Sequence, residues 1–358
     1  MKQPEGLRGV TIVGTGMYVP DRVLTNQDFE RMVETSDEWI RDRTGITERR
    51  IAEPSQAASD LASAAALRAL DAAGLGPLDV DQIVVATTTP DRYLPSCGCT
   101  VQDKIGAKNA AAYDLFAACT GFIYGLGVAR GAIATGMADT VLVIGVEMLS
   151  RIVDYTDRNT CVLFGDGAGA AVLRPCAAGD GLLSISIHSD GSIGDLLEIP
   201  AGGSASPASH ETVEQKGHFI KMKGKELFKV AVRGMSESLK IALDQAGVAA
   251  SDLEVVIPHQ ANLRIIEATR ERLGIGPEKV INNIDRYGNT SSASIPISLD
   301  EVVRSGRLKP GDHVGFVAFG GGVTWGASVM RWTMTSPAPA RAASAPATAA
   351  APAGGESA

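Results

Sequence analysis

Uninterrupted apolar runs alternate with helix-like segments along most of the chain. Four runs are almost wholly apolar: AAYDLFAA (111–118), VLVIGV (141–146), VVI (255–257) and VGFVAF (314–319). Such runs are typical of strands that are covered on both faces of a sheet. The segment LLSISIH (182–188) instead alternates between apolar and polar residues, as a half-exposed strand does. The pattern predicts an α/β fold with buried sheets.

One part of this pattern occurs twice. The segments LDAAGLGPLDVDQIVVA (70–86) and LDQAGVAASDLEVVIPH (243–259) align without a gap, 173 residues apart, with five identical positions. Each copy has the pattern of a helix that ends at a glycine, then a short loop and a buried strand. The same spacing aligns VLVIGV with VGFVAF and Cys119 with Ser292. Three matches at one spacing indicate a duplicated α/β unit.

The duplication divides the chain into two halves and a tail. We expect an N-terminal half at residues 1–175 and a C-terminal half at residues 176–334, stacked in layers around one pseudo-twofold axis. Residues 335–358 are rich in Ala, Pro and Ser and contain almost no large apolar residue. Such a segment cannot bury enough apolar surface to offset the entropy of ordering, so a disordered tail is predicted.

Composition and charge narrow the class of protein. Of the 358 residues, 45% are hydrophobic, which is enough for a large core, and the net charge of −8 argues against nonspecific binding of nucleic acid. No apolar run reaches the ~18 residues of a transmembrane helix, and the run near the N-terminus is too short for a secretory signal. Five cysteines, an odd number, do not suggest a disulfide framework. We therefore expect a cytoplasmic protein with reduced thiols and no membrane partner.

Three polar residues stand where predicted strands end. Cys119 follows the apolar run at 111–118, and His259 follows the strand at 255–257. Asn289 precedes the second-half helix that matches the helix after Cys119. Ligands of α/β sheets bind in crevices at strand ends, and a duplicated fold can bring its two crevices together. The sequence therefore predicts one pocket that holds a thiol, an imidazole and an amide.

Cys119 has the surroundings of a nucleophile. At a helix N-terminus, unpaired backbone N–H groups and the positive end of the helix dipole stabilise a thiolate. The alanines before Cys119 and Gly121 after it leave space for a substrate carbonyl. Its backbone N–H and a second N–H from the glycine run AFGGG (318–322) would form an oxyanion hole, worth about 3 kcal/mol per donor.

Six motifs occur in one order along the chain. They are DEWIRDRTGITERR, AACTGF, TDRNTCVLFGDGAGAAV, PHQANLRII, YGNTSSASIP and FGGGVTWG. Together they resemble the β-ketoacyl-acyl-carrier-protein synthase III family of the thiolase superfamily, and the resemblance spans residues 8–333. It implies a thiolase-like fold, in which duplicated α/β halves stack as five layers, αβαβα, and it implies a homodimer.

The resemblance implies a decarboxylative Claisen condensation that starts fatty-acid synthesis, without a cofactor or a metal. An acyl-CoA primer acylates Cys119, and malonyl-acyl-carrier protein then loses CO₂ so that its enolate attacks the acyl group. His259 and Asn289 would donate hydrogen bonds to the malonyl thioester oxygen, and an amide does so at any working pH. Phe319 would disfavour the ionised malonyl carboxylate relative to CO₂. Gly321 corresponds to the family's second oxyanion donor.

The resemblance also implies residues for substrate binding. They are Trp39, Arg43 and Arg158 for the adenine and phosphates of CoA, Gly224 and Asn262 for the pantetheine tunnel, Leu94 and Phe228 for the acyl pocket, and Lys229, Arg264 and Arg272 for the acidic carrier protein. Two positions depart from the family. Leu94, which would reach the partner's acyl pocket, stands where several relatives have an aromatic ring, and Glu271 stands where a basic pair is common. The primer and the strength of the carrier-protein patch therefore stay open.

Other activities stay open from the sequence. A thiolase would use a second cysteine, where this chain has Ser292, and a hydroxymethylglutaryl-CoA synthase would need a catalytic acid, where ATTTPD offers only Asp91. An acyltransferase of secondary metabolism, forming C–C or ester bonds, fits the same motifs. A cysteine hydrolase can use the same three residue types. A noncatalytic scaffold would have no need of Cys119, His259 and Asn289.

Overall fold

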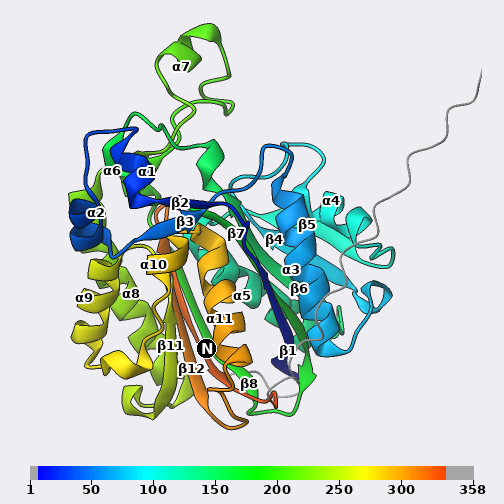
Figure 1. The fold of residues 1–358 in the computed structure, drawn as a ribbon. Helices are drawn as coiled ribbons and strands as arrows, with labels where there is room; N and C mark the ends of the chain where they lie inside the picture. The colour runs from blue at the N-terminus through cyan, green and yellow to red at the C-terminus, as the bar shows by residue number, and fades with distance from the viewer. Residues whose placement is uncertain (1–6, 336–358) are drawn as a thin grey trace, which may run out of the picture.

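Nine strands form one mixed sheet in the computed structural model, which describes residues 7–335 (Figure 1). Their order across the sheet is β11-β12-β13-β8-β1-β7-β6-β4-β5. The first half of the chain supplies β1 (Gly9–Tyr18), β4 (Gln82–Ala86), β5 (Ala111–Leu115), β6 (Val141–Met148) and β7 (Asp166–Cys176). The second half supplies β8 (Gly181–Ser189), β11 (Leu253–Pro258), β12 (His313–Gly320) and β13 (Thr324–Arg331). The predicted disordered tail, from residue 336 onward, lies outside the described residues.

The nine strands divide into two half-sheets of like topology. In the first, β4 is parallel to β5 and β6, and β7 is antiparallel to β6 and β1. In the second, β11 is parallel to β12, and β13 is antiparallel to β12 and β8. The half-sheets join where Val10 of β1 pairs with Gly181 of β8. The predicted division after residue 175 falls at the end of β7 and, as a domain boundary, stays a prediction.

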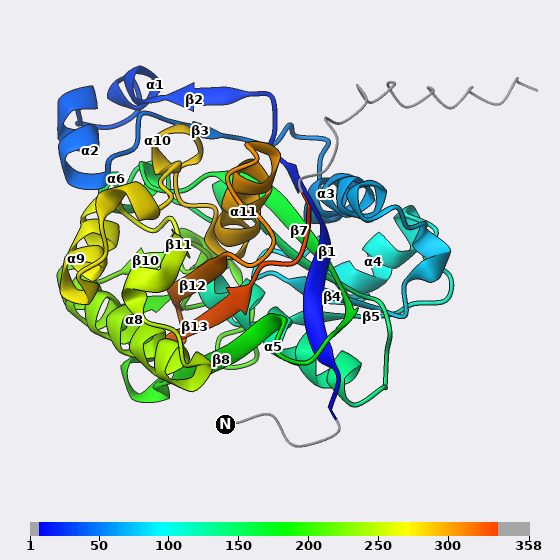
Figure 2. The same cartoon turned by 90° about the horizontal axis from the view of Figure 1, so that it is seen from below.

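Helices cover both half-sheets and fill the space between them (Figure 2). The first half-sheet carries α3 (Ala58–Ala73) and α4 (Cys97–Lys104) on its outer face. The second carries α8 (Gly224–Ala246), against which α9 (Leu263–Leu273) packs. Between the half-sheets lie α5 (Gly121–Ala134) and α11 (Ser294–Arg304). The five predicted layers, αβαβα, are therefore confirmed.

The middle layer joins the two halves through apolar packing. Phe122 and Ile133 of α5, Leu299 of α11 and Phe316 of β12 all have no exposed surface and belong to one core. Full burial of a large apolar side chain stabilises a fold by about 1.5–3 kcal/mol. Because these side chains come from both halves, neither half can present its inner helix to water without losing this energy.

The duplicated elements recur at the spacing found in the sequence. The 3₁₀ turn η2 (Ala118–Thr120) leads into α5, and η7 (Ser291–Ala293) leads into α11, 173 residues later. The helices α3 and α8 each end before a glycine, Gly74 and Gly247, with φ angles of 67° and 68°. This left-handed conformation favours glycine and closes a helix by capping its last carbonyl groups. The predicted helix ends are therefore confirmed.

One strand differs from its prediction. The run at 111–118 was expected to form a strand covered on both faces, but β5 lies at the edge of the sheet. Tyr113 on β5 is 37% exposed, and Phe116, which follows the strand, is 78% exposed. The apolar character of this run therefore does not reflect burial within one chain. The alternating segment at 182–188 lies in β8, as predicted.

Most of the short helices and strands lie at one end of the molecule, the upper end in Figure 1. A projecting loop contains α7, and β9 pairs with β10 at its base. No helix among residues 7–335 is long and apolar enough to cross a membrane. The short elements are β2 (Val23–Thr25), α1 (Asn26–Glu30), α2 (Asp37–Thr44), β3 (Glu48–Arg50), α6 (Arg158–Cys161), β9 (Leu197–Glu198), α7 (His210–Glu214), β10 (Lys221–Met222) and α10 (Ile284–Tyr287).

We predict that Gly145→Ala destabilises the protein by about 1–3 kcal/mol, because it overpacks the seam between the halves. A Cβ at Gly145, in β6, would lie 2.2 Å from the carbonyl oxygen of Ser292 in η7. Gly131→Ala is the matched control, because a Cβ there meets nothing within 4 Å and alanine favours the interior of α5. Urea unfolding should show a lower midpoint for the first variant only. Equal midpoints for Gly145→Ala and the unmodified protein would contradict the prediction.

Candidate active site

A cavity of about 790 Å³ lies where the strand ends of the two halves meet. Cys119 in η2 comes from the first half, whereas His259 after β11 and Asn289 before η7 come from the second. All three line the cavity, together with Phe319 and Gly320 at the end of β12. The residues predicted for catalysis therefore share one cavity, built by both halves.

Cys119 is the middle residue of η2 and is 8% exposed. Gly320 packs so closely that a Cβ there would lie 2.7 Å from the backbone nitrogen of Cys119. Burial raises the pKa of the Cys119 thiol to about 12, although hydrogen bonding with the Ser291 side chain and with its own backbone lowers that pKa. Burial therefore favours the thiol form of Cys119 and outweighs the thiolate-stabilising groups that the sequence predicted around the sulfur.

Glu147, which sequence reasoning missed, is a fully buried carboxylate at the end of β6. It accepts hydrogen bonds from the backbone nitrogen of Thr88 at 3.1 Å, from Oγ1 of Thr89 at 2.7 Å and from Oγ of Ser291 at 3.2 Å. Burial raises the pKa of Glu147 to about 7, and its charge in turn raises the pKa of Cys119. The only signal in the sequence is an acidic residue directly after the run VLVIGV.

His259 is held by both its backbone and its ring. Its backbone N–H donates to the carbonyl oxygen of Val317 at 2.8 Å, and Nδ1 lies 2.7 Å from Oγ of Ser294. Burial lowers the pKa of His259 to about 3, so the imidazole is neutral near pH 7. Within the described part of the chain, Nε2 makes no hydrogen bond, and the residue lines the cavity. Nε2 is therefore the ring atom that is available to a ligand.

Asn289 is fixed by its neighbours on both sides. Its backbone N–H donates to the carbonyl oxygen of Leu163 at 2.8 Å, and its own carbonyl oxygen accepts from the backbone of Gly165 at 3.0 Å. The side-chain Oδ1 accepts from the backbone N–H of Ser291 at 2.8 Å. Because Oδ1 is engaged in this bond, the amide presents Nδ2 as a hydrogen-bond donor to the cavity.

The residues predicted for CoA lie on the wall of the same cavity or next to it. Trp39 in α2 packs against two guanidinium groups, with Cζ of Arg43 and of Arg158 at 5.0 and 5.2 Å from the ring centre. Asn262 caps α9 and donates from Nδ2 to the carbonyl oxygen of Arg43 at 3.0 Å. Gly224 is the first residue of α8. Trp39, Arg43, Gly224 and Asn262 line the cavity.

Not every predicted residue lies on the cavity wall. Phe228 lines the cavity, but Leu94 does not and is 85% exposed. Gly321 follows Gly320 in the chain without lining the cavity itself. Arg158 also stands off the wall, although it stacks on Trp39, which is on the wall. Leu94 was expected to enter the acyl pocket of a partner chain, and this role stays a prediction.

Some of the basic residues predicted to bind the carrier protein line the cavity. Lys229 and Arg264 line it, and Lys229 also lines a second hollow of about 300 Å³ with Arg233 and Arg272. Sequence reasoning missed Arg233. Glu271, which departs from the family pattern, lies 3.7 Å from Arg270 and is thus partly neutralised. Lys229 is thus the predicted carrier-protein residue that the two hollows share, with Arg264 lining one hollow and Arg272 lining the other, and the role of all three stays a prediction.

The cysteines of the described residues are all free: Cys97, Cys99, Cys119, Cys161 and Cys176. Cys97 is buried and Cys99 is exposed, so the two thiols of the C-x-C pair lie in different surroundings. Among residues 7–335, no group of three or more His, Cys, Asp or Glu side chains is arranged to hold a metal ion.

Two family models match this chain. The model described as 3-oxoacyl-[acyl-carrier-protein (ACP)] synthase III matches residues 113–191, and that of the C-terminal part matches residues 243–332. A relative from Caldanaerobacter subterraneus subsp. tengcongensis, named beta-ketoacyl-[acyl-carrier-protein] synthase III, is 55% identical, with 90% of this chain and 97% of the relative covered. A relative of that name from Desulfitobacterium hafniense is 56% identical, with 90% and 98% covered. The chain belongs to the β-ketoacyl-acyl-carrier-protein synthase III family, as its motifs predicted.

Solved structures share the whole fold. The 3-oxoacyl-[acyl-carrier-protein] synthase III of Aquifex aeolicus has a TM-score of 0.84 at 48% identity, with 90% of this chain and 100% of that chain covered. The priming beta-ketosynthase of the R1128 polyketide pathway has a TM-score of 0.87 at 35% identity, with 94% and 99% covered. The predicted thiolase-like fold is therefore confirmed.

We predict that Glu147→Gln increases the reactivity of Cys119. The substitution keeps the shape of the side chain but removes the negative charge that raises the pKa of the thiol. A pKa lower by one unit would make iodoacetamide alkylation about tenfold faster at a fixed pH below that pKa. Peptide mass spectrometry should follow Cys119 itself, since the exposed Cys99 also reacts with iodoacetamide.

The matched control for Glu147→Gln is Asp300→Asn. Asp300 is also buried, but it accepts a hydrogen bond from Thr15 and pairs with Arg304 in α11. This control should leave the alkylation rate of Cys119 unchanged. An unchanged or higher pKa of Cys119 in the Glu147→Gln variant would contradict the assigned influence of the carboxylate.

Proposed function

We propose that the chain condenses an acyl-CoA primer with malonyl-acyl-carrier protein, with loss of CO₂, to form a 3-oxoacyl-acyl-carrier protein that starts fatty-acid synthesis. One observation carries this proposal. A nucleophilic Cys119 from one half shares a cavity with two neutral groups from the other half, His259 and Asn289, which each present an unengaged nitrogen. Acylation requires a nucleophile, and decarboxylation requires hydrogen-bond donors that stabilise the developing oxyanion.

In the first step, Sγ of Cys119 attacks the thioester carbonyl of the primer. The S–H bond breaks as the new S–C bond forms, since burial disfavours a free thiolate. The C–S bond to CoA breaks, and the sulfur of CoA takes up the proton that Cys119 loses, so that CoA leaves as a thiol. We assign the backbone N–H groups of Cys119 and Gly321 to the carbonyl oxygen, and the close packing of Gly320 on Cys119 supports this placement.

In the second step, the malonyl carboxylate leaves as CO₂ and negative charge moves onto the thioester oxygen. Nε2 of His259 and Nδ2 of Asn289 would donate hydrogen bonds to that oxygen. Both donors are neutral, since burial lowers the pKa of His259 to about 3 and an amide does not titrate. Phe319 is 5% exposed on the cavity wall, where its ring favours neutral CO₂ over a carboxylate. The enolate carbon then attacks the acyl carbonyl on Cys119; the C–S bond to Cys119 breaks as the C–C bond forms, and the released sulfur takes up a proton from water to restore the thiol.

The surroundings of the cavity support the proposed substrates. Trp39, with Arg43 and Arg158 beside its ring, offers an aromatic side chain and positive charge for the adenine and phosphates of CoA. We further assign Gly224 and Asn262 to the pantetheine arm and Phe228 to the acyl chain. The basic surface of Lys229, Arg264 and Arg272 would attract an acidic carrier protein.

An acyltransferase of secondary metabolism is the second candidate function. It is supported by the likeness to the R1128 priming ketosynthase over 94% of this chain. Such an enzyme would use the same three residues and differ in its primer, which the position of Leu94 leaves open. We further propose a cytoplasmic location, because the free thiols of the described residues suit a reducing compartment.

A homodimer is also proposed, through the edge of β5. This strand is the last in the sheet, and large apolar side chains are exposed beside it: Tyr93, Leu94, Tyr113 and Phe116. An open strand edge with apolar neighbours is a surface on which a second chain can pair. A second copy paired there would cover these side chains and could bring Leu94 to the neighbouring acyl pocket.

We predict that Cys119→Ala abolishes the acyl adduct formed from acyl-CoA, because the adduct needs the sulfur. Intact-mass spectrometry over primers of varied length and branching measures this and reports the primer preference. His259→Ala and Asn289→Ala should keep acylation but lower decarboxylation of malonyl-acyl-carrier protein about 100-fold or more, since each removes one donor from the developing oxyanion.

The same assay separates the alternative functions. A cysteine hydrolase would release free acid from the primer without consuming malonyl groups. Normal condensation by both second-half variants would refute the roles given to His259 and Asn289. A primer preference for chains foreign to membrane lipids would favour the second candidate function.

We predict that Phe116→Lys weakens the proposed dimer. A charged lysine at an exposed strand edge opposes the approach of a second chain, while leaving the monomer fold intact. Sedimentation velocity should show a dimer for the unmodified protein and a larger monomer fraction for the variant. Val213→Lys is the control, because Val213 is 63% exposed in α7 and is not one of the apolar side chains assigned to the β5 edge. A monomeric unmodified protein would overturn the proposal.

A further inference from the structure

The proposed function requires the proton of His259 to sit on one particular nitrogen. The ring is neutral and fully buried, so it carries one proton on either Nδ1 or Nε2. Only the form protonated on Nε2 can donate a hydrogen bond into the cavity. The hydrogen bond made by the other nitrogen decides which form is present. The partner of Nδ1 is Ser294.

Ser294 is the first residue of α11, and three groups surround its hydroxyl oxygen. Oγ lies 2.7 Å from Nδ1 of His259 and 2.9 Å from the carbonyl oxygen of Ser291, and the backbone N–H of Gln260 donates to it at 3.3 Å. The hydroxyl has one proton and two possible acceptors. The carbonyl of Ser291 already accepts from the backbone N–H of Ser294. The hydroxyl can therefore turn to Nδ1 without leaving a buried carbonyl unsatisfied.

We propose that Ser294 is a positioning residue that donates its hydroxyl proton to Nδ1 of His259 and thereby keeps the ring proton on Nε2. The inference rests on the proposed function, in which Nε2–H donates to the malonyl thioester oxygen. The distance to Nδ1 is the shorter of the two that the hydroxyl can use. With the hydroxyl turned this way, its oxygen still accepts from Gln260, so every group of the cluster is paired.

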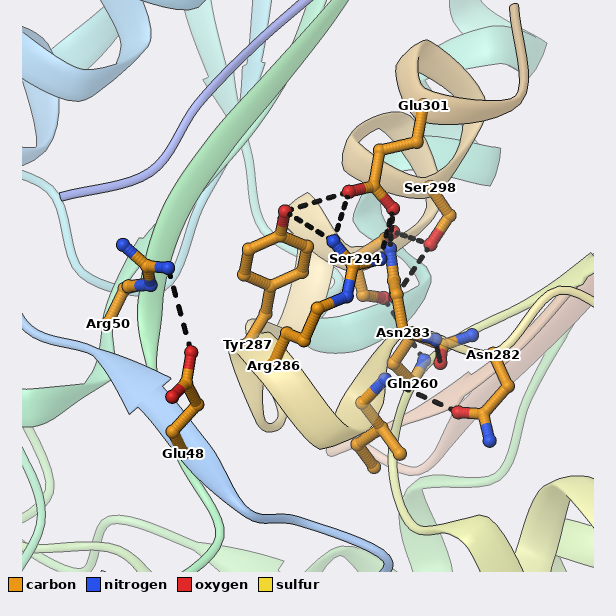
Figure 3. Close-up of polar contacts among 11 residues, drawn as sticks. Glu48, Arg50, Gln260, Asn282, Asn283, Arg286, Tyr287, Ser294, Ser298 and Glu301 are labelled. Carbon is orange, nitrogen blue, oxygen red and sulfur yellow. Dashed lines mark hydrogen bonds and ion pairs between the residues drawn. The ribbon is translucent and has the colours of Figure 1, made fainter. Parts of the chain in front are cut away.

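A second layer of hydrogen bonds holds Ser294 in place (Figure 3). Oγ of Ser298, one turn along α11, lies 2.8 Å from the carbonyl oxygen of Ser294 and 3.1 Å from Oδ1 of Asn283. Nδ2 of Asn283 donates to Glu301 at 2.8 Å, and Arg286 pairs with both oxygens of Glu301. Glu301 and Arg286 are the charged groups of this layer, and they neutralise each other. The start of α11 is therefore fixed by polar contacts behind the histidine.

The test is Ser294→Ala, which removes the hydroxyl and little volume. We expect decarboxylation of malonyl-acyl-carrier protein to fall by about tenfold or more, because a histidine in the wrong tautomer cannot donate. Acylation of Cys119 should stay within about twofold, since it does not need Nε2–H. Ser328→Ala is the control: it removes a buried hydroxyl in β13 that donates to the carbonyl oxygen of Ser184 at 2.8 Å and does not line the cavity, so both rates should stay nearly unchanged.

A spectroscopic measurement separates a change of tautomer from a loosened structure. With ring ¹⁵N-labelled histidine, the unmodified protein should show His259 protonated on Nε2, and Ser294→Ala should show a mixture or the Nδ1 form. An unmodified protein protonated on Nδ1 would overturn the inference, as would decarboxylation by Ser294→Ala within twofold of normal. If the unmodified protein did not decarboxylate malonyl-acyl-carrier protein, the proposed function itself would fail, and if His259→Ala decarboxylated normally, the role given to His259 would fail with this inference. If only Ser294→Ala did so, the function would stand and this inference would not.

Discussion

The site depends on one contact, the packing of the second-half turn η7 against the strand ends of the first half. Ser292 in this turn donates from Oγ to the carbonyl oxygen of Ala86 at 2.8 Å, and its backbone lies against Gly145. Ser291, the residue before it, reaches Glu147. This contact sets where Asn289 and the start of α11 stand relative to Cys119. Each half alone would hold only part of the chemistry.

The contact between the two halves is pseudo-twofold, because η2 of the first half and η7 of the second are equivalent turns. Ala118 and Ser291 occupy equivalent places in η2 and η7, and both have left-handed φ angles, 45° and 48°. One turn presents a cysteine at its second position, and the other presents Ser292. The serine hydroxyl ties the halves together, while the thiol faces the cavity. The two similar turns therefore differ in what they present: one places a thiol on the cavity wall, and the other a hydroxyl that bonds the opposite half.

Burial has opposite consequences for the two titratable groups that face the substrate. It raises the pKa of Cys119 and lowers that of His259, and in both cases the neutral form is favoured. A thiolate–imidazolium pair is therefore not the resting state. The site instead holds neutral groups, whose hydrogen bonds strengthen as charge develops on the substrate.

Sequence reasoning placed Cys119, His259 and Asn289 correctly in one cavity, because strand ends and the constant spacing between the two repeats can be recognised from the sequence alone. It could not find Glu147 or Ser294, since their importance comes from contacts across the two halves. The expected thiolate failed for a related reason: burial is a property of the folded chain. The prediction that β5 is covered on both faces was wrong, because β5 lies at the edge of the sheet. An apolar sequence does not reveal whether its own chain or a second chain covers it.

A crystal structure with an unreactive analogue of the malonyl thioester tests the proposed roles of His259 and Asn289 most directly. We predict that the thioester oxygen lies within about 2.7–3.2 Å of both Nε2 of His259 and Nδ2 of Asn289, with the carboxylate beside Phe319. A bound analogue whose thioester oxygen pointed away from both nitrogens, or whose carboxylate contacted the imidazole, would contradict these roles.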